Sequence, residues 1–267
     1  DLVRALERLR DTPLWDRMQV TVIGDGKHFG LFEEAFADDA NVTVERRFAV
    51  QEEIAALHAL NRLAHEVIAD AFATAVVPGT STAIDVAWWL RQRLHDLCVE
   101  PWFQPSVALQ RAGVPLVEQS GALLPAVPFD AVIEPGDLVH CDVGLTSLGL
   151  RTDSQRNAYV LRPGETAAPD GLDELLAVGR RMQDLTTAEL VPGRTGNEVL
   201  AAARAAAARE GIVADVYSHP VGVHGHGAGP AIGLWDEQAG VPGAGDYPVH
   251  VDTVYALELA VRRRVAE

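Results

Sequence analysis

The sequence predicts an α+β protein in which helices pack on a curved, mostly antiparallel sheet. A long amphipathic helix is indicated between residues 51 and 74, where apolar residues recur every three or four positions. A helix end followed closely by a helix start occurs twice in the chain, and strand-like segments follow each occurrence. The 267 residues are enough for such a domain to bury a core of its own.

The repeated helix boundary combines a Pro-Gly pair with a capped helix start. Pro78-Gly79 precedes Thr82, and Pro192-Gly193 precedes Thr195. Each of these threonines stands three residues before an acid, which is the spacing of a capping box. The two copies lie 113 residues apart and predict duplicated halves, each with two helices followed by strands. The alternative is that a Pro-Gly pair before a capped helix is a common helix boundary, and that its recurrence does not reflect a duplication.

Strand-like segments follow each helical pair, at residues 102–109, 137–144 and 155–161 in the first half and at 212–217 and 254–261 in the second. Residues 1–46 alternate short helical and strand patterns, including a helix around 29–36, and predict the remnant of a small α/β domain. We assign residues 47–267 to the second domain, which carries the candidate site.

Composition excludes several classes of function. With 38 acidic and 22 basic residues the formal net charge is −16, and nucleic acid or an anionic membrane would require a basic face. No apolar stretch approaches the roughly 18 residues of a membrane span. The two cysteines, Cys98 and Cys141, imply no disulfide framework. We therefore expect a cytoplasmic protein.

Two acids stand at unusual places in the strand pattern. Asp142 interrupts an apolar strand, where an unpaired carboxylate is costly to bury. Asp153 follows eleven residues later, and a turn near residues 145–149 would bring both carboxylates together. A divalent cation is the simplest way to offset their repulsion. The alternative is that both aspartates are solvated. His140 lies on the same face of the strand as Asp142 and could also approach the site, and the alternative for it is a packed histidine.

A glycine-rich segment and a second apolar strand supply further candidate ligands. Residues 218–229 contain three histidines within eight positions, His219, His224 and His226, among glycines that allow close backbone approach. Glu258 is the one acid in the apolar strand 254–261. The alternatives are a turn with histidines that face solvent and an edge-strand Glu that faces water.

Together these residues resemble the pita-bread metallopeptidase family of methionine aminopeptidase, aminopeptidase P, prolidase and creatinase. The likeness rests on Gly136-Asp137-Leu138-Val139 running into Asp142-Val143-Gly144, the step to Asp153, a Gly-His-Gly whose His226 has Gly229 three residues on, and Glu258. It covers residues 51–267 and is closest to Xaa-Pro aminopeptidase or dipeptidase. It implies the pita-bread fold and makes residues 1–46 the tail of a smaller N-terminal domain.

The resemblance also implies two divalent metal ions, with manganese as the first choice and cobalt, zinc or iron as alternatives. By position, Asp142 would chelate one ion, Asp153 would bridge both, and His226 with Glu258 would hold the second. The family's fifth ligand, a Glu on a further strand, has no matching context up to Glu267. We therefore expect that the C-terminal strand is missing. A site with only four ligands would bind metal weakly, and the chain would be inactive for lack of the fifth ligand.

The chain departs from the family pattern at two places. The family has a His about seven residues after the metal His, and that position is Gly233 when His226 is taken as the ligand. The family's Thr-Arg-Thr after the second Asp is replaced by Ser154-Gln155-Arg156-Asn157. Other groups would then handle protons, and the candidate catalytic residues are His219, His224 and Glu258.

The activity implied is hydrolysis of the peptide bond before proline by a hydroxide that bridges two metals about 3.5–4 Å apart. The expected partner is a short peptide substrate with proline at the second position, and we also expect a homodimer. Two other functions stay open. One is a creatinase-like hydrolase that cleaves C–N bonds without metal, which the four retained ligands argue against. The other is a catalytically silent pita-bread protein that binds peptides or partners.

Overall fold

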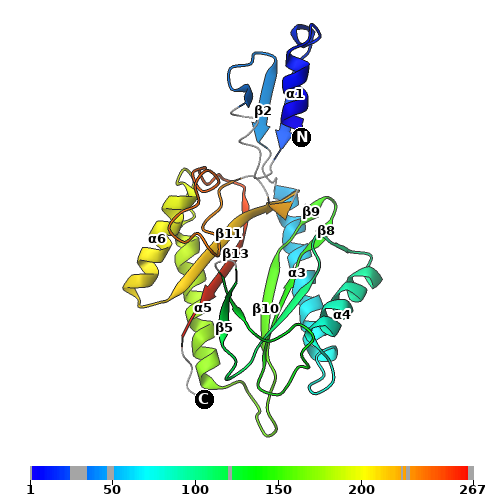
Figure 1. The fold of residues 1–267 in the computed structure, drawn as a ribbon, viewed down its shortest axis with the longest axis vertical. Coiled ribbons are helices and arrows are strands. Elements are labelled where there is room, and N and C mark those ends of the chain that lie inside the picture. Colours follow the sequence, from blue (N-terminus) through cyan, green and yellow to red (C-terminus); the bar gives the residue numbers. More distant parts are fainter. Residues whose placement is uncertain are drawn as a thin grey trace.

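The computed structural model describes residues 2–24, 35–46, 51–119, 122–223, 225–226 and 229–263. From residue 51 onward, two similar halves follow each other, and each packs a pair of helices against a sheet of antiparallel strands (Figure 1). The α+β class predicted from the sequence is confirmed. The β-strands of the two halves form separate hydrogen-bonded sheets within the described residues.

The first half contains two helices and eight short strands. Its elements are α3 (Gln51–Thr74), α4 (Ala83–Asp96), β3 (Glu100–Pro101), β4 (Ser106–Gln110), β5 (Leu116–Gln119), β6 (Ala122–Pro125), β7 (Leu138–Val143), β8 (Leu145–Ser147), β9 (Leu150–Arg151) and β10 (Ser154–Tyr159). β7 is the middle strand of the order β10-β7-β4, and both neighbours run antiparallel to it. This places any side chain at the centre of β7 between two partner strands.

A small hairpin lies between β7 and β10, where the sequence predicts a turn. β8 and β9 pair through Thr146 with Arg151 and Ser147 with Leu150. The two residues between them, Leu148 and Gly149, have φ values of 52° and 78°, as the two central residues of a type I′ turn require. The hairpin returns the chain so that the residue just before β10 lies near the end of β7.

The second half repeats this plan with longer strands. Its elements are α5 (Asp170–Glu189), α6 (Gly196–Arg209), β11 (Ala214–Gly222), β12 (Gly225–His226) and β13 (Val254–Val261). β11 is the middle strand of β12-β11-β13 and pairs antiparallel with both neighbours. β13 has the bounds that the sequence predicts, whereas β11 extends beyond the predicted 212–217 as far as Gly222.

The two capping boxes are present and occupy equivalent positions. Thr82 and Thr195 each accept a hydrogen bond from the backbone N–H three residues on, at 3.1 Å in both cases. The acid at that third position accepts one from the backbone N–H of the threonine, at 2.8 Å. In addition, Gly79 N–H donates to the Ile133 carbonyl and Gly193 N–H to the Val249 carbonyl, both at 2.8 Å. These shared bonds support the predicted duplication.

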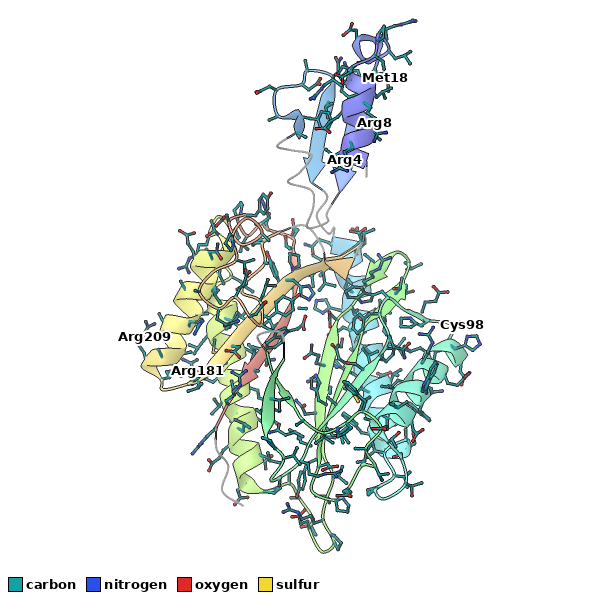
Figure 2. All side chains as sticks on the ribbon, viewed as in Figure 1. Arg4, Arg8, Met18, Cys98, Arg181 and Arg209 are labelled. Atoms are coloured by element: carbon teal, nitrogen blue, oxygen red, sulfur yellow. The ribbon has the colours of Figure 1, made fainter. Side chains whose placement is uncertain are left out.

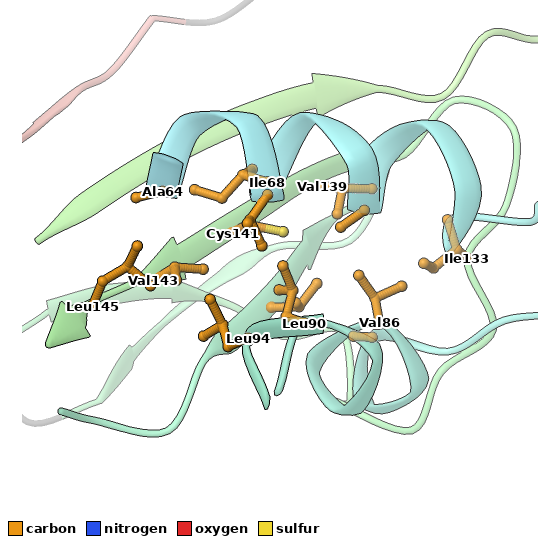
Figure 3. Packing of buried hydrophobic residues seen from close by; sticks show 14 of the residues in the cluster. Ala64, Ile68, Val86, Leu90, Leu94, Ile133, Val139, Cys141, Val143 and Leu145 are labelled. Atoms are coloured by element: carbon orange, nitrogen blue, oxygen red, sulfur yellow. The ribbon is translucent and has the colours of Figure 1, made fainter. Parts of the chain in front are cut away.

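The larger hydrophobic core lies between α3, α4 and the sheet of the first half (Figure 3). Ile68 from α3 and Leu90 from α4 are fully buried there, and burying such a side chain contributes about 1.5–3 kcal/mol. Val139, Cys141 and Val143 of β7 point into the same core. Because side chains alternate along a strand, the intervening residues of β7 point to the opposite face of the sheet.

The N-terminal elements are α1 (Leu2–Arg10), a 3₁₀ turn (Trp15–Arg17), β1 (Val20–Gly24) and β2 (Val42–Arg46), and β1 pairs parallel with β2. Trp15 Nε1 donates to Asp39 at 3.1 Å and holds the turn to the segment before β2. Most of the helix predicted at 29–36 lies outside the described residues. The domain boundary near residue 46 stays a prediction.

Two further sequence expectations concern cysteine and the membrane. Both cysteines are free: Cys98 is exposed after α4 (Figure 2), and Cys141 is buried in β7. Among the described residues, no helix has both the length and the apolar character that a membrane span needs.

Candidate metal centre

Asp142 occupies the face of β7 that points away from the hydrophobic core. Its cross-strand neighbours are Ser106 on β4 and Gln155 on β10. Cys141 and Val143 on either side of it are fully buried against the helices, and this fixes the register that turns Asp142 to the opposite face. Asp153, which immediately precedes β10, lies two residues before Gln155 and therefore on the same face.

The second half presents a histidine and a glutamate from adjacent strands. Tyr217 of β11 pairs with Glu258 of β13, and His219 pairs with Ala256. Side chains two residues apart on one strand share a face, so Tyr217, His219 and Glu258 all lie on one side of this sheet. Val216, the residue before Tyr217, packs against the helices α5 and α6 on the other side.

These side chains converge where the two halves meet. His219 Nε2 lies 2.6 Å from Glu258 Oε1 and 3.6 Å from Asp153 Oδ2. Ligand atoms of Asp153, His219 and Glu258 all lie within 4.8 Å of one another, and their side chains are 7%, 5% and 13% exposed. Such an arrangement of two carboxylates and one imidazole is a donor set that divalent cations prefer.

Asp142 lies at the edge of this group and is coupled to it electrostatically. Burial, and then the carboxylates of Asp153 and Glu258, raise the pKa of Asp142 to about 8. Its Oδ2 is 3.4 Å from the side-chain nitrogen of Gln155. These carboxyl groups therefore gather more negative charge than they can hold fully ionised.

The two carboxylates beside His219 favour its protonated form. Burial by itself lowers the pKa of His219, but hydrogen bonds with Asp153 and Glu258 outweigh this effect and raise the pKa to about 9. Its Nδ1–H donates to the Pro220 carbonyl at 3.1 Å, so Nε2 is the nitrogen that faces the carboxylates. The same backbone contact would orient Nε2 as a metal ligand.

The unsatisfied oxygens of the site test whether its residues fit a metal. Among the described residues, Asp142 Oδ1 and Asp153 Oδ1 are buried and have no hydrogen-bond partner. Leaving buried polar atoms unpaired is costly, and cations would satisfy both oxygens together with the convergent ligands. The donor set and the unpaired oxygens therefore fit the divalent metals that the resemblance implies.

The structure brings together three of the four residues nominated as metal ligands, Asp142, Asp153 and Glu258. For the fourth, His226, the structure describes the backbone of β12 but not the side chain, and its cross-strand partner is Val221. His224 lies outside the described residues. His219, which the sequence nominates for catalysis, is the imidazole in the cluster.

A signal in the sequence favours His219 over His226 as the metal histidine. Gly222 follows His219 by three residues, just as Gly229 follows His226. The second histidine expected about seven residues later falls on His226 when the count starts at His219, whereas it falls on Gly233 when the count starts at His226. The apparent departure from the family pattern at Gly233 therefore disappears.

His140 occupies the same face of β7 as Asp142. Its Nδ1 lies 3.0 Å from Asn157 Oδ1 on β10, directly across the strand pair. Burial lowers the pKa of His140, while Asn157 and the negative charge of Glu258 act against this effect. The ring is therefore held by a neighbouring strand near the cluster.

Aromatic side chains and a cavity border the cluster. The ring of Tyr217 lies 5.2 Å from that of His219 and 5.7 Å from that of Trp235, between centroids. A cavity of about 250 Å³ opens beside Asp153, between α3 and the strands β11 and β13. The residues Leu57, Arg151 and Tyr255 contribute to its lining. A small substrate group has space next to the carboxylate cluster.

Solved structures with a similar fold are peptidases. An X-Pro aminopeptidase from Thermotoga maritima is 17% identical with a TM-score of 0.57, and the match covers 97% of this chain and 70% of that one. A dipeptidase from Pyrococcus horikoshii is 14% identical with a TM-score of 0.58, covering 95% and 66%. A methionine aminopeptidase from Rickettsia prowazekii is 14% identical with a TM-score of 0.51, covering 80% and 94%. The chain thus spans under two thirds of the dipeptidase's length.

At these identities the likeness concerns the fold, and it confirms the pita-bread fold that the sequence predicts. A search of the curated proteins finds no significant match. The model of metallopeptidase family M24 matches residues 55–262, most of the chain and all of the cluster described above. The chain belongs to metallopeptidase family M24.

Proposed function

We propose that this protein is a metal-dependent exopeptidase that hydrolyses the peptide bond before proline, with two divalent cations held by Asp142, Asp153, His219 and Glu258. The observation that carries the proposal is the buried cluster of Asp153, His219 and Glu258, whose ligand atoms lie within 4.8 Å of one another. The unpaired oxygens of Asp142 and Asp153 support it. In this proposal His219 replaces His226 as the histidine ligand.

Each residue of the cluster has a distinct task in this proposal. Bound divalent cations would supply an activated water and polarise the scissile carbonyl. Asp153 lies near both Asp142 and His219, so its carboxylate would help to hold the bound cations. His219 is oriented by the Pro220 carbonyl, and Glu258 is placed to accept a proton during the reaction.

A second histidine is proposed to assist at the substrate carbonyl. His226 lies on β12, which pairs with β11 two residues beyond His219 through Val221. His226 is the seventh residue after His219. We assign to His226 the role at the substrate carbonyl that the sequence suggests for His219 and His224, and His224 stays a candidate.

The proposed substrate is a short peptide with proline at the second position. Support comes from the fold shared with an X-Pro aminopeptidase and a dipeptidase. The cavity beside Asp153 has the volume for a small residue. The carboxylate-rich donor set suits manganese first, with cobalt, zinc or iron as alternatives.

An activity assay with defined metals tests this function. The protein is stripped with chelator and reloaded with Mn²⁺, Co²⁺ or Zn²⁺, then offered an Ala-Pro dipeptide, a longer Ala-Pro peptide and an Ala-Ala peptide as control. We expect metal-dependent release of alanine from the proline peptides. Glu258→Gln should abolish it, by a factor of about 10² or more, because it removes a ligand and a proton acceptor.

The other outcomes identify the other functions. Turnover of a small C–N compound that chelator leaves unchanged would point to the metal-free hydrolase. Absence of cleavage with every metal would point to a silent binding protein. Cleavage of Ala-Ala as fast as Ala-Pro would retain the metallopeptidase and remove the proline specificity.

A further inference from the structure

Gln155 lies at the junction of the two halves and is not one of the proposed metal ligands. It lies directly across from Asp142 in the pairing of β10 with β7 and two residues after Asp153. Its side chain is partly buried. The side chain therefore shares the face on which the carboxylates converge.

The side-chain nitrogen of Gln155 contacts a carboxylate from each half. Nε2 lies 2.9 Å from Glu258 Oε2 and 3.4 Å from Asp142 Oδ2. An amide nitrogen carries two hydrogens and can donate to both acceptors at once. Asp142 belongs to β7 and Glu258 to β13, strands that lie in different sheets. One side chain thus links the carboxylates of both halves.

The charges around Gln155 explain why a neutral donor fits this position. Gln155 donates to the carboxyl groups of Asp142 and Glu258, and His219 Nε2 lies 2.6 Å from Glu258 Oε1. A Lys or Arg there would compete with cations for the same oxygens. A further carboxylate would add negative charge beside Asp142, whose pKa burial and then the nearby carboxylates already raise to about 8.

We propose that Gln155 is a positioning residue, whose amide sets the separation of Asp142 and Glu258 across the junction and so prepares the ligands for metal. The inference rests on the metal site of the proposed function and deepens it. Partners that orient the ligands of a metal typically change metal affinity by about 10–100-fold when they are lost. Gln155 therefore affects metal binding without being a ligand.

Two substitutions separate the donor role from packing. Gln155→Met keeps the approximate length and volume and removes both hydrogen bonds. Gln155→Glu keeps the shape and replaces the donor with another negative charge. Gln92→Met on the exposed side of α4, where Gln92 bonds Asp96 at 2.8 Å, is the matched control. Circular dichroism of each variant checks that it is folded.

The first measurement is thermal unfolding in the presence of chelator. We expect the wild type to be the most stable, Gln155→Met to follow, and Gln155→Glu to be the least stable, with steps of about 2–4 °C in Tm. Gln155→Met loses the hydrogen-bond donor, and Gln155→Glu loses the donor and also adds a negative charge, so we expect this order. Equal Tm values for the wild type and both variants would overturn the positioning role, whatever the metal result.

The second measurement is the dissociation constant for Mn²⁺ by isothermal titration calorimetry. We expect it to rise about tenfold in Gln155→Met and to stay unchanged in Gln92→Met. Wild-type affinity in Gln155→Met would overturn the inference and leave the proposed function standing. If the wild type itself binds no Mn²⁺, the proposed function fails, and the order of metal-free stabilities still decides whether Gln155 holds the carboxylates together.

Discussion

Asp142 is a single residue whose burial costs stability at the candidate site. Its neighbours Cys141 and Val143 fix it in the middle of a sheet, where burial and two other carboxylates raise its pKa to about 8. The charged form is therefore disfavoured in the metal-free protein. Such local costs are typical of functional sites, because the same groups gain their favourable interactions only when the ligand is present.

At this scale we predict that Asp142→Asn stabilises the metal-free protein while removing metal binding. A neutral amide avoids the free energy that the buried carboxyl group costs at neutral pH because its pKa is raised on folding. The free energy of unfolding in chelator should therefore rise by about 1 kcal/mol or more, a gain of about 2–4 °C in Tm. Asp184→Asn, on an exposed position of α5, should change stability by less than about 0.5 kcal/mol. If Asp142→Asn were less stable than the wild type, both measured in chelator, burial of the Asp142 carboxyl group would not be a cost to stability.

The capping boxes illustrate what an element can reveal by itself. A threonine three residues before an acid predicts a helix start, and both predicted starts are found, at α4 and α6. Only neighbouring residues are needed for this bond pattern, so the sequence contains the full signal. The bounds of β11 were less predictable, because its last residues, such as His219 and Pro220, pair with β13 far along the chain.

We predict that the two caps contribute similarly to stability. Thr82→Ala and Thr195→Ala should each lower the free energy of unfolding by about 1 kcal/mol, measured by urea denaturation. Thr82→Ser and Thr195→Ser keep the hydroxyl and serve as matched controls with smaller losses. Alanine variants as stable as the serine variants would show that the hydroxyl bonds contribute nothing.

In the whole molecule, the candidate site is a connection between the two halves. β7 and the residue just before β10 supply two carboxylates, while β11 and β13 supply the imidazole and the glutamate. Within the described residues, β7 and β10 belong to one sheet and β11 and β13 to another. A ligand that binds only when both halves are in place stabilises the folded state by mass action. Metal binding and the stability of the junction are therefore linked.

We predict that Mn²⁺ raises the Tm of the wild type and that chelator reverses the rise. At a free metal concentration 100 times Kd, the gain is about 2.7 kcal/mol. His219→Ala should abolish the metal-dependent shift, because it removes the imidazole ligand between Asp153 and Glu258. Differential scanning fluorimetry over a metal titration measures it. An unchanged shift in His219→Ala would exclude His219 from the metal site.

The sequence by itself determined the α+β class and the duplicated capped helices, and it nominated the carboxylates Asp142, Asp153 and Glu258, because these signals depend on nearby residues and on strand periodicity. It did not decide which histidine joins them, since His219 and His226 lie in similar glycine-rich surroundings. Nor did it indicate the bond from Gln155 to Glu258, which are 103 positions apart. The tertiary structure alone placed the His219 imidazole against Glu258 and bonded Gln155 to the same carboxylate, because cross-strand register and the contact between halves arise only when distant strands pack.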